Sequence, residues 1–465
     1  WQKISTGSMG GSFRFNYGIH DEAGNLYTSG KLTGFADYFG TPVQVSGQRT
    51  IISKLEPSGQ VAWSQVVNDL NSADMYPFGP QVAHDHEGRL ITTGRFDLQL
   101  KLGAFTLVNQ NLNADGYVVR YSSTGEPDWV TQLHASDQCN INGVAVDHNG
   151  YVIVTGIFTG LLQVGGYQLD SGPGQAVYVI KLDQNGNRLW GLSFPGEELY
   201  LAMPAVDPDG NIFIACEYYS HTTGIIDFGG VTTPQGPDDG GTVLCKIDAT
   251  GSVKWVRTYG GSALDPDPSG WPTAIKTDSN GNCFLWGWCY DQANFGGKTF
   301  ANPLTVTSSS KWNYYITKID PAGEVVWADV VFEKNYSFNY GDHLDLDREG
   351  NVYVGGHFRD SIEVSGQRFK PETPNDLFVI KYSNDGNFRW IRTLPTGGTN
   401  FSCLSVLKEN SVTVSGISGA LLNVGPFPVI RKGGPTAVLA TLGDLMPHFV
   451  PVWSGNGVDQ MNINI

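Results

Sequence analysis

The sequence predicts an all-β fold, a seven-bladed β-propeller with four-stranded blades, from three observations. Seven segments of the 465 residues share one turn-and-strand pattern, tryptophan recurs at a fixed place after a second turn, and no segment shows helical periodicity. Aromatic residues make up 12% of the chain and glycine is frequent, with 59 residues, whereas charged residues make up only 16%. This composition is typical of turn-rich β proteins.

Each repeat begins with an Asp-containing turn that leads into a strand. The turns read DEAGN from residue 21, DHEGR from 85, DHNGY from 147, DPDGN from 207, DSNGN from 278 and DREGN from 347. A second glycine follows six residues after the turn glycine in five of these six copies. In the remaining copy, which begins at residue 207, Cys216 replaces it. The seventh copy, LKENSVTVSG, has Asn410 at the turn and Gly416 six residues later. Because asparagine tolerates positive φ better than other non-glycine residues, this substitution supports the alignment.

The second half of the repeat contains a strand, which has a basic residue in six of the seven copies, and in those six copies a turn that ends in glycine follows. In six copies a tryptophan follows that glycine after four residues, at intervals of 61 to 72 residues: Trp63, Trp129, Trp190, Trp255, Trp327 and Trp390. We interpret this tryptophan as docking one blade on the next. The seventh copy lacks it, and Trp1 lies 62 residues before Trp63, one repeat period. The N-terminal strand is therefore expected to complete the last blade and close the ring.

The two motifs, D-x-x-G-N-x-Y-x-x-G and K-x-D-x-x-G-x-x-x-W, resemble the SBBP-type β-propeller repeat of bacteria over roughly residues 1–445. This resemblance implies an exported or surface-exposed multidomain protein. The proteins of this family have varied roles. The second half of the repeat also looks like the tryptophan-docking repeat of pyrroloquinoline-quinone dehydrogenases, from which only the docking role is carried over. Residues 446–465 lie outside the repeat and are expected to be a linker and the first strand of a following β domain. The start at Trp1 rather than Met suggests a processed N-terminus, as in an exported protein.

Charge and hydropathy argue against several partners. The net charge of −16 provides no cationic surplus for nucleic acid or anionic membranes. No apolar run approaches the length of a membrane span, so we expect no membrane insertion. The six cysteines show no framework spacing, which favours buried thiols, with one disulfide between Cys216 and Cys245 as the alternative.

Two groups of residues could hold a metal, but each has a simpler interpretation. The Asp turns resemble calcium loops, yet no EF-hand glutamate follows them, so hairpin turns are favoured over Ca²⁺ at one or two of them. His20 and His84 occupy equivalent positions in adjacent repeats, and we favour core histidines over metal ligands. The sequence therefore predicts no cofactor.

The innermost strands should line a central channel. Counting back five residues from each first-turn glycine, or from Asn410, gives Ile19, Ala83, Ala145, Ala205, Lys276, Asp345 and Ser405. These residues alternate with apolar ones and are expected to face the channel. Lys276 and Asp345 would then form a channel salt bridge. Acid–base catalysis is the alternative, although no second carboxylate completes a glycosidase pair.

Loop aromatics of the fifth and sixth repeats form the candidate ligand site. The candidates are Trp271, Trp288, Tyr290, Trp312, Tyr314, Tyr336 and Tyr340, with Asp265 and Asp267 nearby. Aromatic faces stack on sugar rings, and acidic side chains bond hydroxyls. The alternative is that these rings pack the loops and the blade core.

The function that follows is a non-enzymatic recognition or scaffold module of an exported bacterial surface protein. It would bind a glycan or a cell-surface protein through its loop face, alongside further domains of the same polypeptide. One alternative is an architectural subunit of a surface layer or filament. Another is a polysaccharide-degrading enzyme, a lyase or glycoside hydrolase, with its site over the channel.

Overall fold

The chain folds into antiparallel β-sheets. The computed structural model describes residues 3–7, 12–38, 41–69, 81–109, 113–196, 199–218, 227–233, 241–259, 270–290, 292–301, 312–333, 343–373, 375–395, 401–408, 411–418, 422–424, 427–429 and 436–443. Every named element in these ranges is a strand, and every strand pairing is antiparallel. No helix of the length and apolarity needed to cross a membrane occurs in this part of the chain.

One order of four strands recurs along the chain, and within each group every strand is hydrogen-bonded to the next. The first group contains β2 (Ser12–His20), β3 (Leu26–Tyr38), β4 (Thr41–Leu55) and β5 (Val61–Asp69). It is followed by β6 (Val82–His84), β7 (Leu90–Phe96), β10 (Asp115–Tyr121) and β11 (Pro127–Ala135), and then by β12 (Cys139–Val146), β13 (Val152–Val164), β14 (Tyr167–Leu182) and β15 (Arg188–Pro195). Next come β16 (Leu199–Val206), β17 (Ile212–Tyr218), β18 (Gly241–Ile247) and β19 (Val253–Tyr259).

The later part of the chain keeps this order. It contains β20 (Trp271–Thr277), β21 (Cys283–Tyr290), β24 (Trp312–Ile319) and β25 (Val325–Glu333), and then β26 (His343–Leu346), β27 (Val352–Phe358), β30 (Asp376–Tyr382) and β31 (Phe388–Pro395). Two short hairpins extend larger sheets: β8 (Gln99–Leu102) with β9 (Phe105–Val108), and β28 (Ile362–Val364) with β29 (Gln367–Phe369). Two others form separate two-stranded sheets: β22 (Gln292–Phe295) with β23 (Lys298–Ala301), and β34 (Leu422–Val424) with β35 (Phe427–Val429).

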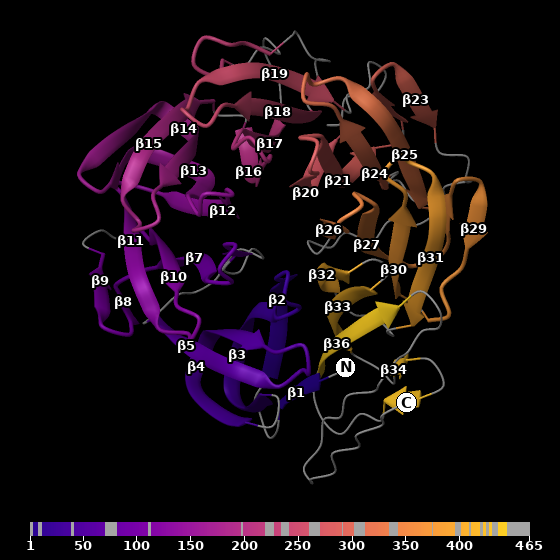
Figure 1. Ribbon diagram of the computed structural model, residues 1–465, viewed down its shortest axis with the longest axis horizontal. Helices are drawn as coiled ribbons and strands as arrows, with labels where there is room; N and C mark the ends of the chain where they lie inside the picture. Colours follow the sequence, from indigo (N-terminus) through magenta and orange to yellow (C-terminus); the bar gives the residue numbers. More distant parts are fainter. Residues whose placement is uncertain are drawn as a thin grey trace.

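The two ends of the described chain meet in one sheet. Strands β32 (Phe401–Lys408), β33 (Ser411–Ser418) and β36 (Thr436–Gly443) pair in that order, and β1 (Lys3–Gly7) pairs with β36. Ile4 lies opposite Val438 in this register. The sheets follow one another in a propeller-like ring, with β12, β16, β20, β26 and β32 nearest its centre (Figure 1).

The aspartate of each first turn holds the turn together. In the DPDGN turn, Asp207 Oδ1 accepts hydrogen bonds from the N–H groups of Asp209 and Asn211, at 3.0 and 2.8 Å. The basic residue of the third strand then reaches the same carboxylate. Four such ion pairs are Lys181–Asp147 at 2.9 Å, Lys246–Asp207 at 3.6 Å, Lys318–Asp278 at 3.5 Å and Lys381–Asp347 at 3.9 Å. In these four copies the Asp and Lys of the repeat are therefore partners in a buried pair.

The second glycine of the repeat lies opposite a bulge in the innermost strand. Gly156 pairs with Ile141 just before the register shifts by one residue, and Gly287 pairs with Pro272 at the same place in its sheet. A Cβ on Gly156 would lie 1.9 Å from the Asn140 carbonyl oxygen, and one on Gly287 would lie 2.0 Å from that of Trp271. No side chain fits at such distances, which explains why glycine recurs here.

The repeat tryptophan docks one sheet on the next, as predicted. Its indole N–H donates to a carbonyl in the second turn of the following sheet: Trp63 to Ser123, Trp129 to Gln184, Trp190 to Ala249, Trp255 to Pro321 and Trp327 to Asn384, at 2.9–3.3 Å. The ring lies flat on the turn glycine, and a Cβ added to Gly186 would lie 2.6 Å from the Trp129 ring. We call this contact, with the Asp–Lys pair beside it, the sheet joint. Trp1 and the 446–465 segment lie outside the described residues.

The apolar core lies between neighbouring sheets. One buried cluster combines Phe284, Trp286, Trp288 and Tyr314 of one sheet with Val352 and Phe378 of the next. All six cysteines are buried thiols, so Cys216 and Cys245 form no disulfide.

Candidate functional site

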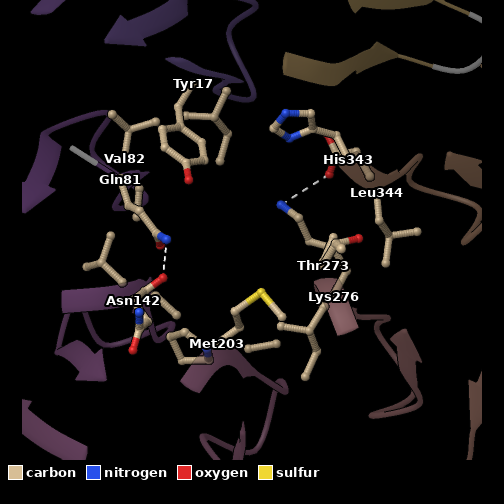
Figure 2. Close-up of a pocket in the computed structure, with 18 of the residues that line it drawn as sticks. Tyr17, Gln81, Val82, Asn142, Met203, Thr273, Lys276, His343 and Leu344 are labelled. Carbon is tan, nitrogen blue, oxygen red and sulfur yellow. Dashed lines mark hydrogen bonds and ion pairs between the residues drawn. The ribbon is translucent and has the colours of Figure 1, made fainter. Parts of the chain in front are cut away.

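A cavity of roughly 390 Å³ opens at the centre of the ring. Its wall is built from the innermost strands, and Figure 2 shows their side chains surrounding it. Six of the seven residues predicted to face the channel line it, namely Ile19, Ala83, Ala145, Ala205, Lys276 and Asp345. The residues one position earlier in each strand, such as Gly18, Val82 and Leu344, line the cavity as well.

The predicted channel salt bridge is present. Lys276 Nζ lies 3.2 Å from Asp345 Oδ1, and the two side chains come from the neighbouring strands β20 and β26. The other carboxylate oxygen accepts the Val406 N–H at 2.8 Å and the Ser405 hydroxyl at 3.4 Å. Because both oxygens are engaged, Asp345 serves as a fixed structural charge.

His20 is a core histidine, whereas His84 is half-buried and lines the cavity. His20 is buried, and its Nδ1 lies 3.1 Å from the Ser405 hydroxyl. Burial lowers the pKa of His20 to about 4, against the opposing effects of Asp345 and Asp21, so the ring is neutral near pH 7. His84 Nε2 lies 2.9 Å from the His20 carbonyl oxygen and donates to it. The described residues contain no group of three or more His, Cys, Asp or Glu side chains placed to hold a metal ion.

Neutral polar residues line several sides of the cavity (Figure 2). Tyr17, Gln81, Asn142 and Thr273 all line it, each from a different innermost strand or from the residue directly before one. Removal from bulk water raises the pKa of Tyr17 to about 12, so its phenol stays a neutral hydroxyl. The Gln81 amide donates to the Asn142 carbonyl, and the Thr273 hydroxyl donates to the Trp286 carbonyl at 3.2 Å.

Two of the candidate aromatics reach the cavity, and a third packs behind them. Trp271 and Trp288 line the wall, and Trp312 lies with its ring centroid 4.9 Å from that of Trp271. Tyr314 is fully buried and stacks against Trp286 at 5.1 Å, with its hydroxyl donating to the His357 carbonyl. This burial removes Tyr314 from the candidate ligand surface. It sits directly opposite Trp288 in the β21–β24 ladder, where both rings face the neighbouring sheet.

The remaining candidates cannot be placed. Asp265, Asp267, Tyr336 and Tyr340 lie outside the described residues, as does the side chain of Tyr290.

Sequence reasoning missed Tyr17, Gln81, Asn142, Thr273 and His343, which all line the cavity. Three of these residues sit two positions before a channel-facing residue that was identified, so continuing the same alternation would have found Tyr17, Gln81 and His343. The Tyr17 and His343 rings lie 6.1 Å apart, edge to face. The alternation does not lead to Asn142 and Thr273, because a bulge in each of their strands shifts it by one residue.

Comparisons with known proteins give distant similarities. No family model matches the chain, so membership of the SBBP-type repeat family remains a prediction. The chain is 22% identical over 361 residues to an uncharacterized WD repeat-containing protein of Acanthamoeba polyphaga mimivirus. That match covers 64% of this chain and spans about a quarter of the relative, 26% of its length.

Three solved structures are similar over most of their length. A protein of unknown function from Dyadobacter fermentans matches at 10% identity and a TM-score of 0.40, over 95% of this chain and 98% of that one. A polysaccharide lyase matches at 10% identity and a TM-score of 0.43, over 91% and 90% of the two chains. An ulvan lyase bound to -[GlcA(1-4)Rha3S]- matches at 11% identity and a TM-score of 0.43, over 92% and 91%. Similarities this distant assign no activity to the chain.

Proposed function

We propose that the chain is a closed seven-bladed β-propeller and a non-enzymatic recognition module that binds a glycan at its central cavity. Seven sequence repeats and the recurring four-strand order support the blade count. The pairing of β1 with β36 supports closure by the N-terminal strand. An exported or cell-surface location is part of the proposal and rests on the resemblance of the repeats.

The observation that carries the binding proposal is the chemistry of the cavity wall. The half-buried aromatic side chain of Trp271 stands on the same wall as the neutral polar groups of Gln81, Asn142 and Thr273, and the buried Trp288 packs beside it. A saccharide ring presents an apolar C–H face and a rim of hydroxyl groups. An aromatic surface suits the first, and side chains that both donate and accept hydrogen bonds suit the second.

A hydrolase is less compatible with this wall. Glycoside hydrolases use two carboxyl groups that flank the scissile bond. Among the described residues that line the cavity, Asp345 is the one carboxylate, and it is held by Lys276 and by the Val406 N–H.

A polysaccharide lyase is the second candidate, because Tyr17, His343 and Lys276 share the cavity. A lyase needs a base that removes a proton next to a sugar carboxylate and an acid that protonates the leaving oxygen. Tyr17, with its pKa raised to about 12, is suited to donate a proton rather than to accept one. Lys276, already paired with Asp345, has little free charge for a uronate.

A glycan-array screen, with and without Ca²⁺, tests the proposal. Trp271→Ala should lower the affinity for any glycan bound by the wild type by roughly tenfold or more, since it removes the stacking surface. Tyr167→Ala is the matched control, because Tyr167 is an exposed aromatic on β14 that does not line the cavity.

The outcomes separate the candidate functions. Glycan binding that Trp271→Ala weakens and Tyr167→Ala leaves unchanged supports recognition at the cavity. Appearance of ultraviolet-absorbing unsaturated sugars on incubation with uronate polysaccharides would establish the lyase instead. Absence of glycan binding together with ordered self-assembly would replace both with the architectural role.

A further inference from the structure

The Lys276 ammonium group opens into the cavity. Figure 2 shows its nitrogen directed toward the open centre, and the side chain is 37% exposed. The lysines of the sheet joints are enclosed by comparison, since the side chain of Lys181 is 4% exposed and that of Lys246 is 10% exposed. Lys276 therefore faces the space that a ligand would fill.

This ammonium group keeps hydrogen-bond donors for a ligand. A lysine has three N–H donors, and within the described part of the chain Lys276 Nζ has one partner, Asp345 Oδ1 at 3.2 Å. The joint residue Lys318, by contrast, lies 3.5 Å from Asp278 and also donates to the Asn384 carbonyl at 3.4 Å. Lys276 can therefore donate to a sugar hydroxyl and keep its ion pair.

Asp345 sets the charge of this part of the wall. The Val406 N–H donates to its Oδ2 at 2.8 Å, so the carboxylate is held in place beside Lys276. A sugar carboxylate that approached the ammonium group would also meet this carboxylate and be repelled by it. The pair is a local feature rather than part of the repeat, because the equivalent cavity-lining positions of other innermost strands hold Ile19, Ala83, Ala145 and Ala205.

We propose that the Lys276–Asp345 pair sets the charge preference of the cavity: Lys276 donates a hydrogen bond to a hydroxyl group of a neutral sugar, and Asp345 disfavours sugars that carry a carboxylate. The inference rests on the proposed glycan recognition and names neutral saccharides, rather than uronates, as its ligand class. A hydrogen bond from a charged donor is stronger than one between neutral groups. A like charge beside the site gives specificity by weakening the binding of the wrong ligand.

The test compares two sets of ligands by calorimetric titration. The probes are the methyl glycosides of glucose, galactose and mannose and those of the three matching uronic acids, which carry a carboxylate in place of the CH₂OH group. The titrations are run at about pH 8, well above the range in which histidine side chains usually take up a proton, because His84 and His343 also line the cavity. The wild type should bind at least one neutral glycoside roughly tenfold more tightly than its uronic acid.

Asp345→Asn should abolish this preference, because it leaves the Lys276 ammonium group without its counter-charge. Affinity for the uronic acid glycoside should rise roughly tenfold relative to that for the neutral one. The asparagine amide oxygen can still accept the Val406 N–H, so the variant should keep the fold of the wall.

Lys276→Met tests the ammonium group itself and should bind the neutral glycoside roughly tenfold more weakly than the wild type. Combining Lys276→Met with Asp345→Asn leaves neither charge of the pair in the wall, so this double variant should fold even if the single lysine variant does not. It should bind the neutral glycoside as weakly as Lys276→Met and show no gain for the uronic acid. Unchanged affinity for the neutral glycoside in the double variant would overturn the role of Lys276.

Asp248→Asn is the matched control. It also removes a carboxylate from a Lys–Asp pair, with Lys254 at 3.4 Å, but Asp248 does not line the cavity. This variant should keep the wild-type preference. A wild type that binds the uronic acid glycosides as tightly as the neutral ones, or an Asp345→Asn protein that keeps the wild-type preference, would overturn this inference and leave the proposed function standing. Failure of the wild type to bind any saccharide would overturn both.

Discussion

The sheet joints and the cavity wall are built from the same repeats, yet they differ in how completely their polar groups are satisfied. In the joints, the Trp327 indole N–H donates to the Asn384 carbonyl, and Lys181 pairs with Asp147 inside the protein. In the wall, the bulge residue Asn142 leaves its amide oxygen unpaired. Repeated residues therefore pair with one another in the joints, whereas the residues that line the cavity differ in type from strand to strand.

The largest expected effect comes from breaking a joint. Trp327→Ala should lower the free energy of unfolding by roughly 3–5 kcal/mol, because the ring is 8% exposed and packs on the Gly386 turn. Urea denaturation followed by circular dichroism measures this loss. Saccharide affinity of the folded variant should stay unchanged. A loss below about 1 kcal/mol would show that the tryptophans do not hold the sheets together.

The buried ion pair of a joint should give the next largest effect. Lys181→Met should destabilise the protein by roughly 3 kcal/mol, because it leaves the Asp147 carboxylate buried without its cation. Lys254→Met is the control, since the Lys254–Asp248 pair is on the surface and should contribute no more than about 1 kcal/mol. Equal losses in the two variants would mean that burial does not distinguish the joint from a surface pair.

The joints could be predicted from sequence because each depends on a contact that recurs. Trp, Gly, Asp and Lys return at fixed spacing, and repetition reveals a partnership that one copy would leave ambiguous. The predicted aromatic site included rings that the structure places in the core between sheets. Phe284, Trp286 and Trp288 follow the two-residue period of a strand with one buried face, and this face packs on the next sheet rather than forming a binding loop.

The bulge residues could not be found in this way. Counting back from the turn identifies channel-facing positions only as far as the alternation holds, and the bulge shifts that alternation by one residue. Asn142 therefore has no position in the period-two pattern. Asn142 and Gly143 form an Asn-Gly pair within β12, but such a pair in a sequence does not by itself distinguish a bulge from a turn.

The smallest expected effect concerns the pH dependence of stability that arises from the buried His20. Because burial lowers the pKa of His20 from 6.5 to about 4, the unfolded chain takes up this proton first as the pH falls. The free energy of unfolding that depends on a neutral His20 is therefore at its full value above about pH 6.5, and it decreases as the pH falls toward 4. Between about pH 7 and about pH 4.5 the loss should be roughly 2 kcal/mol.

His20→Gln provides the comparison for this effect, because glutamine does not titrate. Unfolding free energies measured across the same pH range should fall less steeply for the variant than for the wild type. Parallel curves would show that His20 titrates alike in the folded and unfolded chains. The carboxylates of Asp21 and Asp345 beside His20 are present in both proteins, so their contribution largely cancels in the comparison.

The most direct test of saccharide recognition at the cavity is a crystal structure of the protein soaked with the tightest-binding methyl hexoside. The account predicts the sugar ring in the central cavity, near Trp271. A sugar bound elsewhere on the molecule, with the cavity filled by water alone, would contradict it.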